Sequence, residues 1–109
     1  VTFRTHLLPQ DIEKLLGGDP LARQIGQLSE TWLEFLRTHF GRNQPRVALH
    51  DPLTAAVLVR EDLCPFTEAA ISVDDRAASH REDAEPNILV ATDVDNDELR
   101  KHLMETWLG

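Results

Sequence analysis

The stretch from residue 47 to residue 59 has the densest run of apolar side chains and constrains the fold most. One polar pair, His50-Asp51, interrupts it, and Pro52 follows directly. Proline suits the first position of a helix, so the pattern predicts a helix from Pro52 to about Arg60 with Asp51 as its N-cap. Apolar residues lie on nearly every side of this helix, which predicts that it is buried rather than half exposed.

The His50-Asp51 pair is the first candidate for a functional element. A histidine and a carboxylate beside a buried helix are expensive to remove from water, so their presence there suggests a use. Ordinary helix capping and a hydrogen-bonded histidine are nevertheless favoured by about three to one on spacing alone, because such short motifs produce many false positives.

Two further helices are predicted before this stretch. Pro9 opens a short one over residues 9–16, and Asp19-Pro20 opens a long one over residues 20–40 that Gly41 ends. The apolar residues of the long helix recur at helical spacing: Leu21, Ile25, Leu28, Trp32 and Phe35. This stripe predicts the face that packs into the core, and core packing is also the expected role of Trp32, Phe35 and Phe40.

The second half of the chain predicts a strand pair and a final helix. Residues 66–73 and 88–91 have strand patterns and are expected to pair in antiparallel fashion. The charged segment 74–86 between them predicts a solvated, mobile loop. Asp95 and Glu98 form a capping box that begins a helix over residues 96–108. The expected fold is mixed α/β and mainly helical, with about four helices and a short two-stranded antiparallel pair.

Composition narrows the classes of partner. The net charge is −8 and no basic cluster offsets it, so nucleic acid is not expected as a partner. No apolar run is long enough to span a bilayer, which gives no reason to expect a membrane partner. The single cysteine, Cys64, cannot form an internal disulfide; it is expected to be a small buried hydrophobe, and the chain to be cytoplasmic. The 109 residues make one domain or a segment of one.

Several segments, in order, resemble the C-terminal part of the inosine-uridine-preferring nucleoside hydrolase family. The matching segments are residues 1–2, 7–12, 35–41 and, most specifically, 49–55 (Leu-His-Asp-Pro-Leu-Thr-Ala), with weaker echoes at 71–74 and 86–95. The resemblance implies the C-terminal segment of a Rossmann-like open α/β fold. The chain departs from the family pattern in two ways: it lacks the aspartate-rich N-terminal motif, and residues 76–79 replace a glycine-containing turn.

The resemblance also implies roles for particular residues. The reaction would be hydrolysis of the N-glycosidic bond of a ribonucleoside, with His50 as the acid that protonates the departing base. Asp51 would be one ligand of a calcium ion whose other ligands lie in the N-terminal portion. Trp32 and Phe40 would be candidates for stacking on the base of the substrate. A histidine at position 50 resembles the branch that accepts pyrimidine nucleosides. The segment alone is not expected to catalyse the reaction.

Two other hypotheses remain open from the sequence. The chain could be a catalytically inert module that uses an exposed apolar face to form a homo-oligomer or bind a partner. The spacing Asp93-x-Asp95-x-Asp97 superficially resembles a calcium loop, but it lacks the glycine and the distal glutamate of such loops. A calcium loop at this spacing therefore has about one chance in ten, and an independent calcium-binding domain is the least expected of the three hypotheses.

Overall fold

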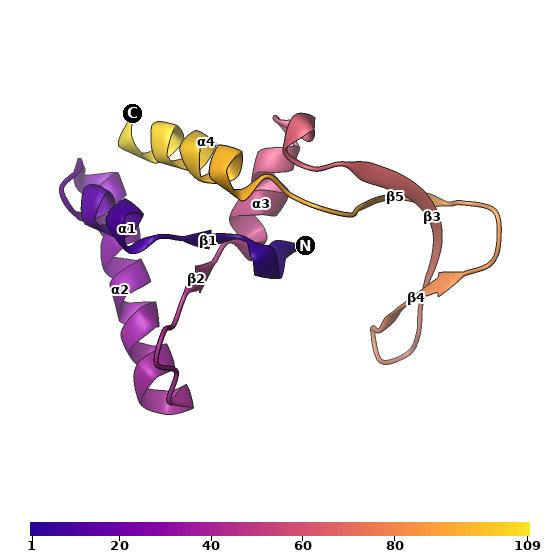
Figure 1. Cartoon of the computed structure of the whole chain (residues 1–109), viewed down its shortest axis with the longest axis horizontal. Helices are drawn as coiled ribbons and strands as arrows, with labels where there is room; N and C mark the ends of the chain where they lie inside the picture. The colour runs from indigo at the N-terminus through magenta and orange to yellow at the C-terminus, as the bar shows by residue number, and fades with distance from the viewer.

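The computed structural model describes residues 1–109 and has a helical body from which a small sheet projects (Figure 1). The helices are α1 (Pro9–Leu16), α2 (Pro20–Phe40), α3 (His50–Val57) and α4 (Asn96–Leu108), with short 3-10 turns η1 (Thr2–Arg4) and η2 (Glu61–Leu63). The strands are β1 (His6–Leu7), β2 (Val47–Ala48), β3 (Phe66–Val73), β4 (Ser79–Glu82) and β5 (Ile88–Ala91). The predicted mixed α/β, mainly helical class is confirmed.

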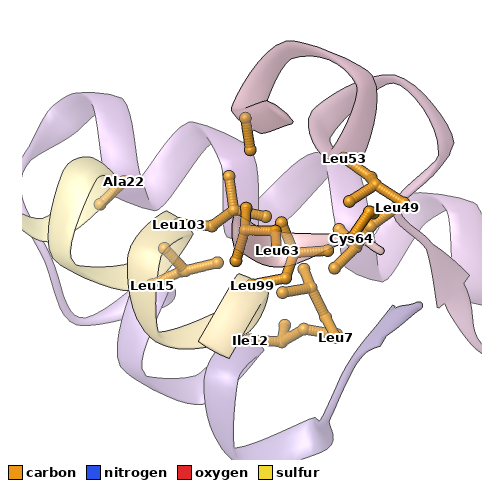
Figure 2. Packing of buried hydrophobic residues seen from close by; sticks show 11 residues of the cluster. Leu7, Ile12, Leu15, Ala22, Leu49, Leu53, Leu63, Cys64, Leu99 and Leu103 are labelled. Atoms are coloured by element: carbon orange, nitrogen blue, oxygen red, sulfur yellow. The ribbon is translucent and has the colours of Figure 1, made fainter. Parts of the chain in front are cut away.

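The core lies where α1, α3 and α4 meet, and Figure 2 shows its side chains converging from these elements. Its largest fully buried aliphatic side chains come from four separate segments: Leu15, Leu49, Leu63 and Leu99. Cys64 is buried in the same cluster, as predicted, and burial raises the pKa of its thiol. Apolar burial of this kind is the main force that holds the helices together.

An ion pair links α1 to α4 beside this core. The Arg100 guanidinium donates from Nε to Asp11 Oδ2 at 2.7 Å and from Nη2 to Asp11 Oδ1 at 2.9 Å. The Leu8 backbone N–H also donates to Asp11 Oδ2, at 2.9 Å. Burial alone would raise the pKa of Asp11, but these hydrogen bonds outweigh it and hold the pKa below its ordinary value.

The long helix α2 buries a different face from the one predicted. Leu21, Leu28 and Trp32 are exposed, whereas the buried positions are small or lie one residue further along: Ala22, Gly26, Ser29 and Leu36. The reason is close packing against α1, since a Cβ atom on Gly26 would come within 3.0 Å of the Leu16 side chain. The predicted core role of Trp32, Phe35 and Phe40 was therefore wrong, because all three are exposed.

The helix α3 begins earlier and is shorter than predicted. The Leu53 N–H donates to Leu49 O, so Leu49 is the N-cap and the helix already includes His50 and Asp51. The prediction that Asp51 is the N-cap was wrong. The helix ends at Val57 and buries only Leu53 and Ala56, so it is half exposed rather than surrounded by core.

The projecting sheet has the strand order β4-β3-β5, and both pairs are antiparallel. The pairing of β3 with β5 was predicted, but residues 74–86 are not simply a loop because they contain β4. Asp74 organises the turn, since its Oδ1 accepts the N–H groups of Arg76 and Ala78 and its Oδ2 pairs with His80 Nε2 at 2.8 Å. Ala77 takes a positive φ of 63° in this turn.

The predicted start of α4 is confirmed in part. The Asp95 side chain accepts the Glu98 N–H at 3.0 Å, as an N-cap does. The Glu98 carboxylate lies 3.7 Å from Arg60 Nη2 instead of completing the capping box. No helix of the chain is both long enough and apolar enough to cross a membrane.

Candidate functional site

The four residues singled out from the sequence lie around one groove of about 590 Å³. Trp32 and Phe40 come from α2, and His50 and Asp51 come from the first turn of α3. The other lining residues come from these two helices and from the segments between and before them: Phe3, Leu36, Arg42, Arg46, Ala48 and Pro52. The groove thus joins parts of the chain that are far apart in sequence.

The His50 ring is hydrogen bonded through only one of its two nitrogens. Its Nδ1 lies 2.7 Å from the Thr2 hydroxyl oxygen, and Nε2 has no hydrogen-bond partner in the chain. The ring of Phe3 meets the imidazole edge to face, with 4.9 Å between centroids and 81° between planes. An exposed imidazole with one nitrogen bonded and the other free is suited to exchange a proton with a bound molecule.

Asp51 is exposed and its carboxylate forms no hydrogen bond or ion pair within the chain. Asp51 lies in the first turn of α3, where a carboxylate side chain is favourably placed. Calcium requires about six to eight oxygen ligands. No group of three or more His, Cys, Asp or Glu side chains is close enough to hold a metal ion. The residues of this chain therefore do not fit a calcium ion by themselves, and Asp51 could supply only one ligand.

The α2 side of the groove is an aromatic surface. Trp32 is 47% exposed and Phe40 is 63% exposed, and the ring of Phe35 contacts the rings of both. The Phe35 centroid is 5.3 Å from that of Trp32 in a stacked arrangement and 5.9 Å from that of Phe40. Exposed aromatic faces of this kind can stack on a planar ring from a ligand.

Sequence reasoning missed the basic residues and the N-terminal turn at this site. Arg42 and Arg46 bring positive charge to the groove, and the Arg42 guanidinium carbon lies 5.9 Å from the Phe40 ring centroid. Thr2 and Phe3 contact His50 only because the chain folds η1 against α3. The two arginines in the short segment before His50 could have been identified from the sequence as a source of positive charge near the site. No sequence pattern around Thr2 indicated that it contacts His50.

A second hollow, of about 480 Å³, lies between α1 and α2. Its lining includes Ile12, Leu33 and the carboxylates of Glu13, Glu30 and Glu34, and it contains none of the four candidate residues. It lacks both a histidine and an exposed aromatic face. The groove at His50 is therefore the better candidate for a functional site.

Comparison with known proteins shows which known fold this chain shares. No family model and no curated protein matches this sequence. Among solved structures, the chain is similar to a plant nucleoside hydrolase, the PpNRh1 enzyme, with a TM-score of 0.85 and 18% sequence identity. The similarity covers 100% of this chain and 39% of that one, so the chain spans about two fifths of the length of the plant enzyme. The chain therefore has the fold of part of a nucleoside hydrolase.

Proposed function

We propose that the chain is the C-terminal segment of a nucleoside hydrolase-like protein. Joined to its N-terminal portion, it takes part in hydrolysing the N-glycosidic bond of ribonucleosides to ribose and free base. One observation carries the proposal: His50, Asp51, Trp32 and Phe40 line a single groove in a chain with part of the nucleoside hydrolase fold. By resemblance, the histidine at position 50 favours the inosine-uridine-preferring branch.

His50 acts as the acid in this proposal. When the glycosidic bond breaks, the bonding electrons move onto the base. Water supplies the hydroxyl that ends on the sugar carbon and gives its other proton to a base outside residues 1–109. The protonated imidazole donates its Nε2 proton to the departing base, which leaves as a neutral molecule. Nε2 is the ring nitrogen with no partner in the chain, which supports its assignment as the donor.

Trp32 and Phe40 bind the base in the proposed site. Both are exposed on the α2 side of the groove, and Arg42 and Arg46 lie nearby. Stacking of a nucleobase on an aromatic side chain contributes about 1–3 kcal/mol. Asp51 would contribute one carboxylate to a calcium ion, with the remaining ligands coming from outside residues 1–109. The activation of water likewise belongs to residues outside this segment.

A leaving-group comparison tests the acid role. In the longer protein, His50→Gln should slow hydrolysis of inosine and uridine by about 10²- to 10⁴-fold, the usual contribution of a general acid. A nitrophenyl riboside should lose far less, since its leaving group needs no proton. His80→Gln is the matched control because His80 lies on β4, outside the groove. Equal losses on both kinds of substrate would remove the acid role.

A second function, that of a catalytically inert module for dimerisation or partner binding, is favoured by the exposed apolar side chains. Leu58 is 84% exposed and Val59 is 74% exposed just after the end of α3, and Leu89 is exposed on β5. Apolar surface of this kind often marks an interface. Light scattering on the 109-residue chain tests this reading. A strictly monomeric and soluble chain would count against it.

A further inference from the structure

The turn η1 contacts the His50 ring at two points, and these contacts suggest a role for Thr2. The Thr2 hydroxyl oxygen is 2.7 Å from Nδ1, and Phe3 packs its ring edge to face with the imidazole. Each contact restricts rotation of the imidazole about the Cβ–Cγ bond. Together they favour one orientation of the two ring nitrogens.

The turn η1 is itself fastened to the start of α3. Thr5 is fully buried, with 0% exposure, and its hydroxyl donates to Thr2 O at 2.7 Å. The Leu49 N–H donates to Thr5 O at 3.2 Å, and Leu49 is the N-cap of α3. Thr2 and His50 therefore lie on two segments that are joined by hydrogen bonds through the buried residues Thr5 and Leu49. The contact between their side chains follows from this arrangement.

We propose that Thr2 is a positioning residue that orients His50 so that Nε2, rather than Nδ1, meets the departing base. In the protonated ring both nitrogens carry hydrogen, so Nδ1–H donates to the Thr2 hydroxyl oxygen and Nε2–H is the remaining donor. After Nε2 gives up its proton, the Nδ1–H bond to Thr2 is retained. The catalytic consequence rests on the proposed function, whereas the orientation of the ring does not.

The orientation is tested by the ring nitrogen signals of His50 in the 109-residue chain. Two-bond nitrogen–proton correlations at alkaline pH give the ratio of the two neutral tautomers. Thr2→Val keeps the shape of the side chain but removes the hydroxyl that accepts from Nδ1–H. It should therefore lower the ratio of the Nδ1–H tautomer to the Nε2–H tautomer by about fivefold, the effect of one hydrogen bond. Thr2→Ser should keep the wild-type ratio. Identical ratios in Thr2→Val and wild type would overturn the proposal.

Kinetics in the longer protein separate this inference from the proposed function. Thr2→Val should slow hydrolysis of inosine and uridine about fivefold, Thr2→Ser should restore the rate, and Thr2→Val should add no further loss to His50→Gln. An independent loss in the double variant would overturn the positioning role. If His50→Gln instead affects natural and activated substrates equally while the tautomer ratio still responds to Thr2→Val, the acid role fails and the orientation by Thr2 stands.

Discussion

The Asp11–Arg100 ion pair gives the sharpest prediction for stability. The side chain of Asp11 is 5% exposed and that of Arg100 is 16% exposed, and two hydrogen bonds join them. Removing one partner of a buried pair costs about 3–5 kcal/mol, because the other charge is left without compensation. Water still reaches part of Arg100, so we expect Asp11→Asn to lower the free energy of unfolding by about 3 kcal/mol, at the lower end of this range.

Urea unfolding followed by tryptophan fluorescence measures this loss, since Trp107 packs against the core. Asp97→Asn is the matched control because Asp97 pairs with the same Arg100, at 3.3 Å, but is 91% exposed. An exposed pair contributes little, so this control should change the free energy of unfolding by less than about 1 kcal/mol. If Asp11→Asn costs no more than Asp97→Asn, the buried pair does not stabilise the fold as argued.

The same pair predicts how stability depends on pH. The pKa of Asp11 is lower in the folded chain than its ordinary value of 3.8, owing to Arg100 and the Leu8 N–H, which outweigh burial. The stabilisation from ionised Asp11 is therefore present above pH 3.8 and is lost as the pH falls through the lower folded pKa. Asp11→Asn should remove this part of the acid sensitivity. An unchanged acid profile in the variant would contradict the assignment.

Two further variants test the core and one helix end. Leu99 is fully buried, so Leu99→Ala should lower the free energy of unfolding by about 2–5 kcal/mol in urea; a loss below 1 kcal/mol would show that the core collapses around the cavity. Gly41 ends α2 with φ of 60°, and a Cβ there would meet no atom within 4 Å. Gly41→Ala should therefore cost only the backbone strain of about 1–2 kcal/mol, and a neutral thermal melt would argue against that strain.

The sequence correctly predicted the elements whose ends are marked by proline or glycine or whose residues follow a clear strand pattern. Pro9 and Pro20 open α1 and α2, and Gly41 closes α2, so the predicted bounds of these helices match the structure. Alternation located β3, and the continuous apolar run Ile-Leu-Val-Ala located β5, equally well. These signals are local, because each depends on backbone geometry within one turn or on one repeating pattern. The strand β4 was missed because its charged residues have no apolar alternation.

The choice of buried face on α2 could not be read from hydrophobicity. The aromatic stripe was the more apolar face, but α1 packs against the face that carries Ala22 and Gly26. Small residues let two helices approach closely, which is a property of the pair of helices rather than of either one alone. The same limit applies to Thr2, whose contact with His50 spans 48 positions. Position 50 was marked as a candidate by its place beside an apolar helix, but its role as an acid was inferred only from the family resemblance.

The two largest errors in reading the helices both fall at the groove. Had Asp51 been the N-cap, its carboxylate would have been used by the backbone; because Leu49 takes that place, the carboxylate has no partner in the chain. Had Trp32 and Phe40 been in the core, α2 would have no aromatic surface at the groove that His50 lines. Each departure gives up a local gain, a capped helix or buried apolar area, and leaves a side chain available to another molecule. Such local costs are expected where a chain is built to bind or react rather than only to fold.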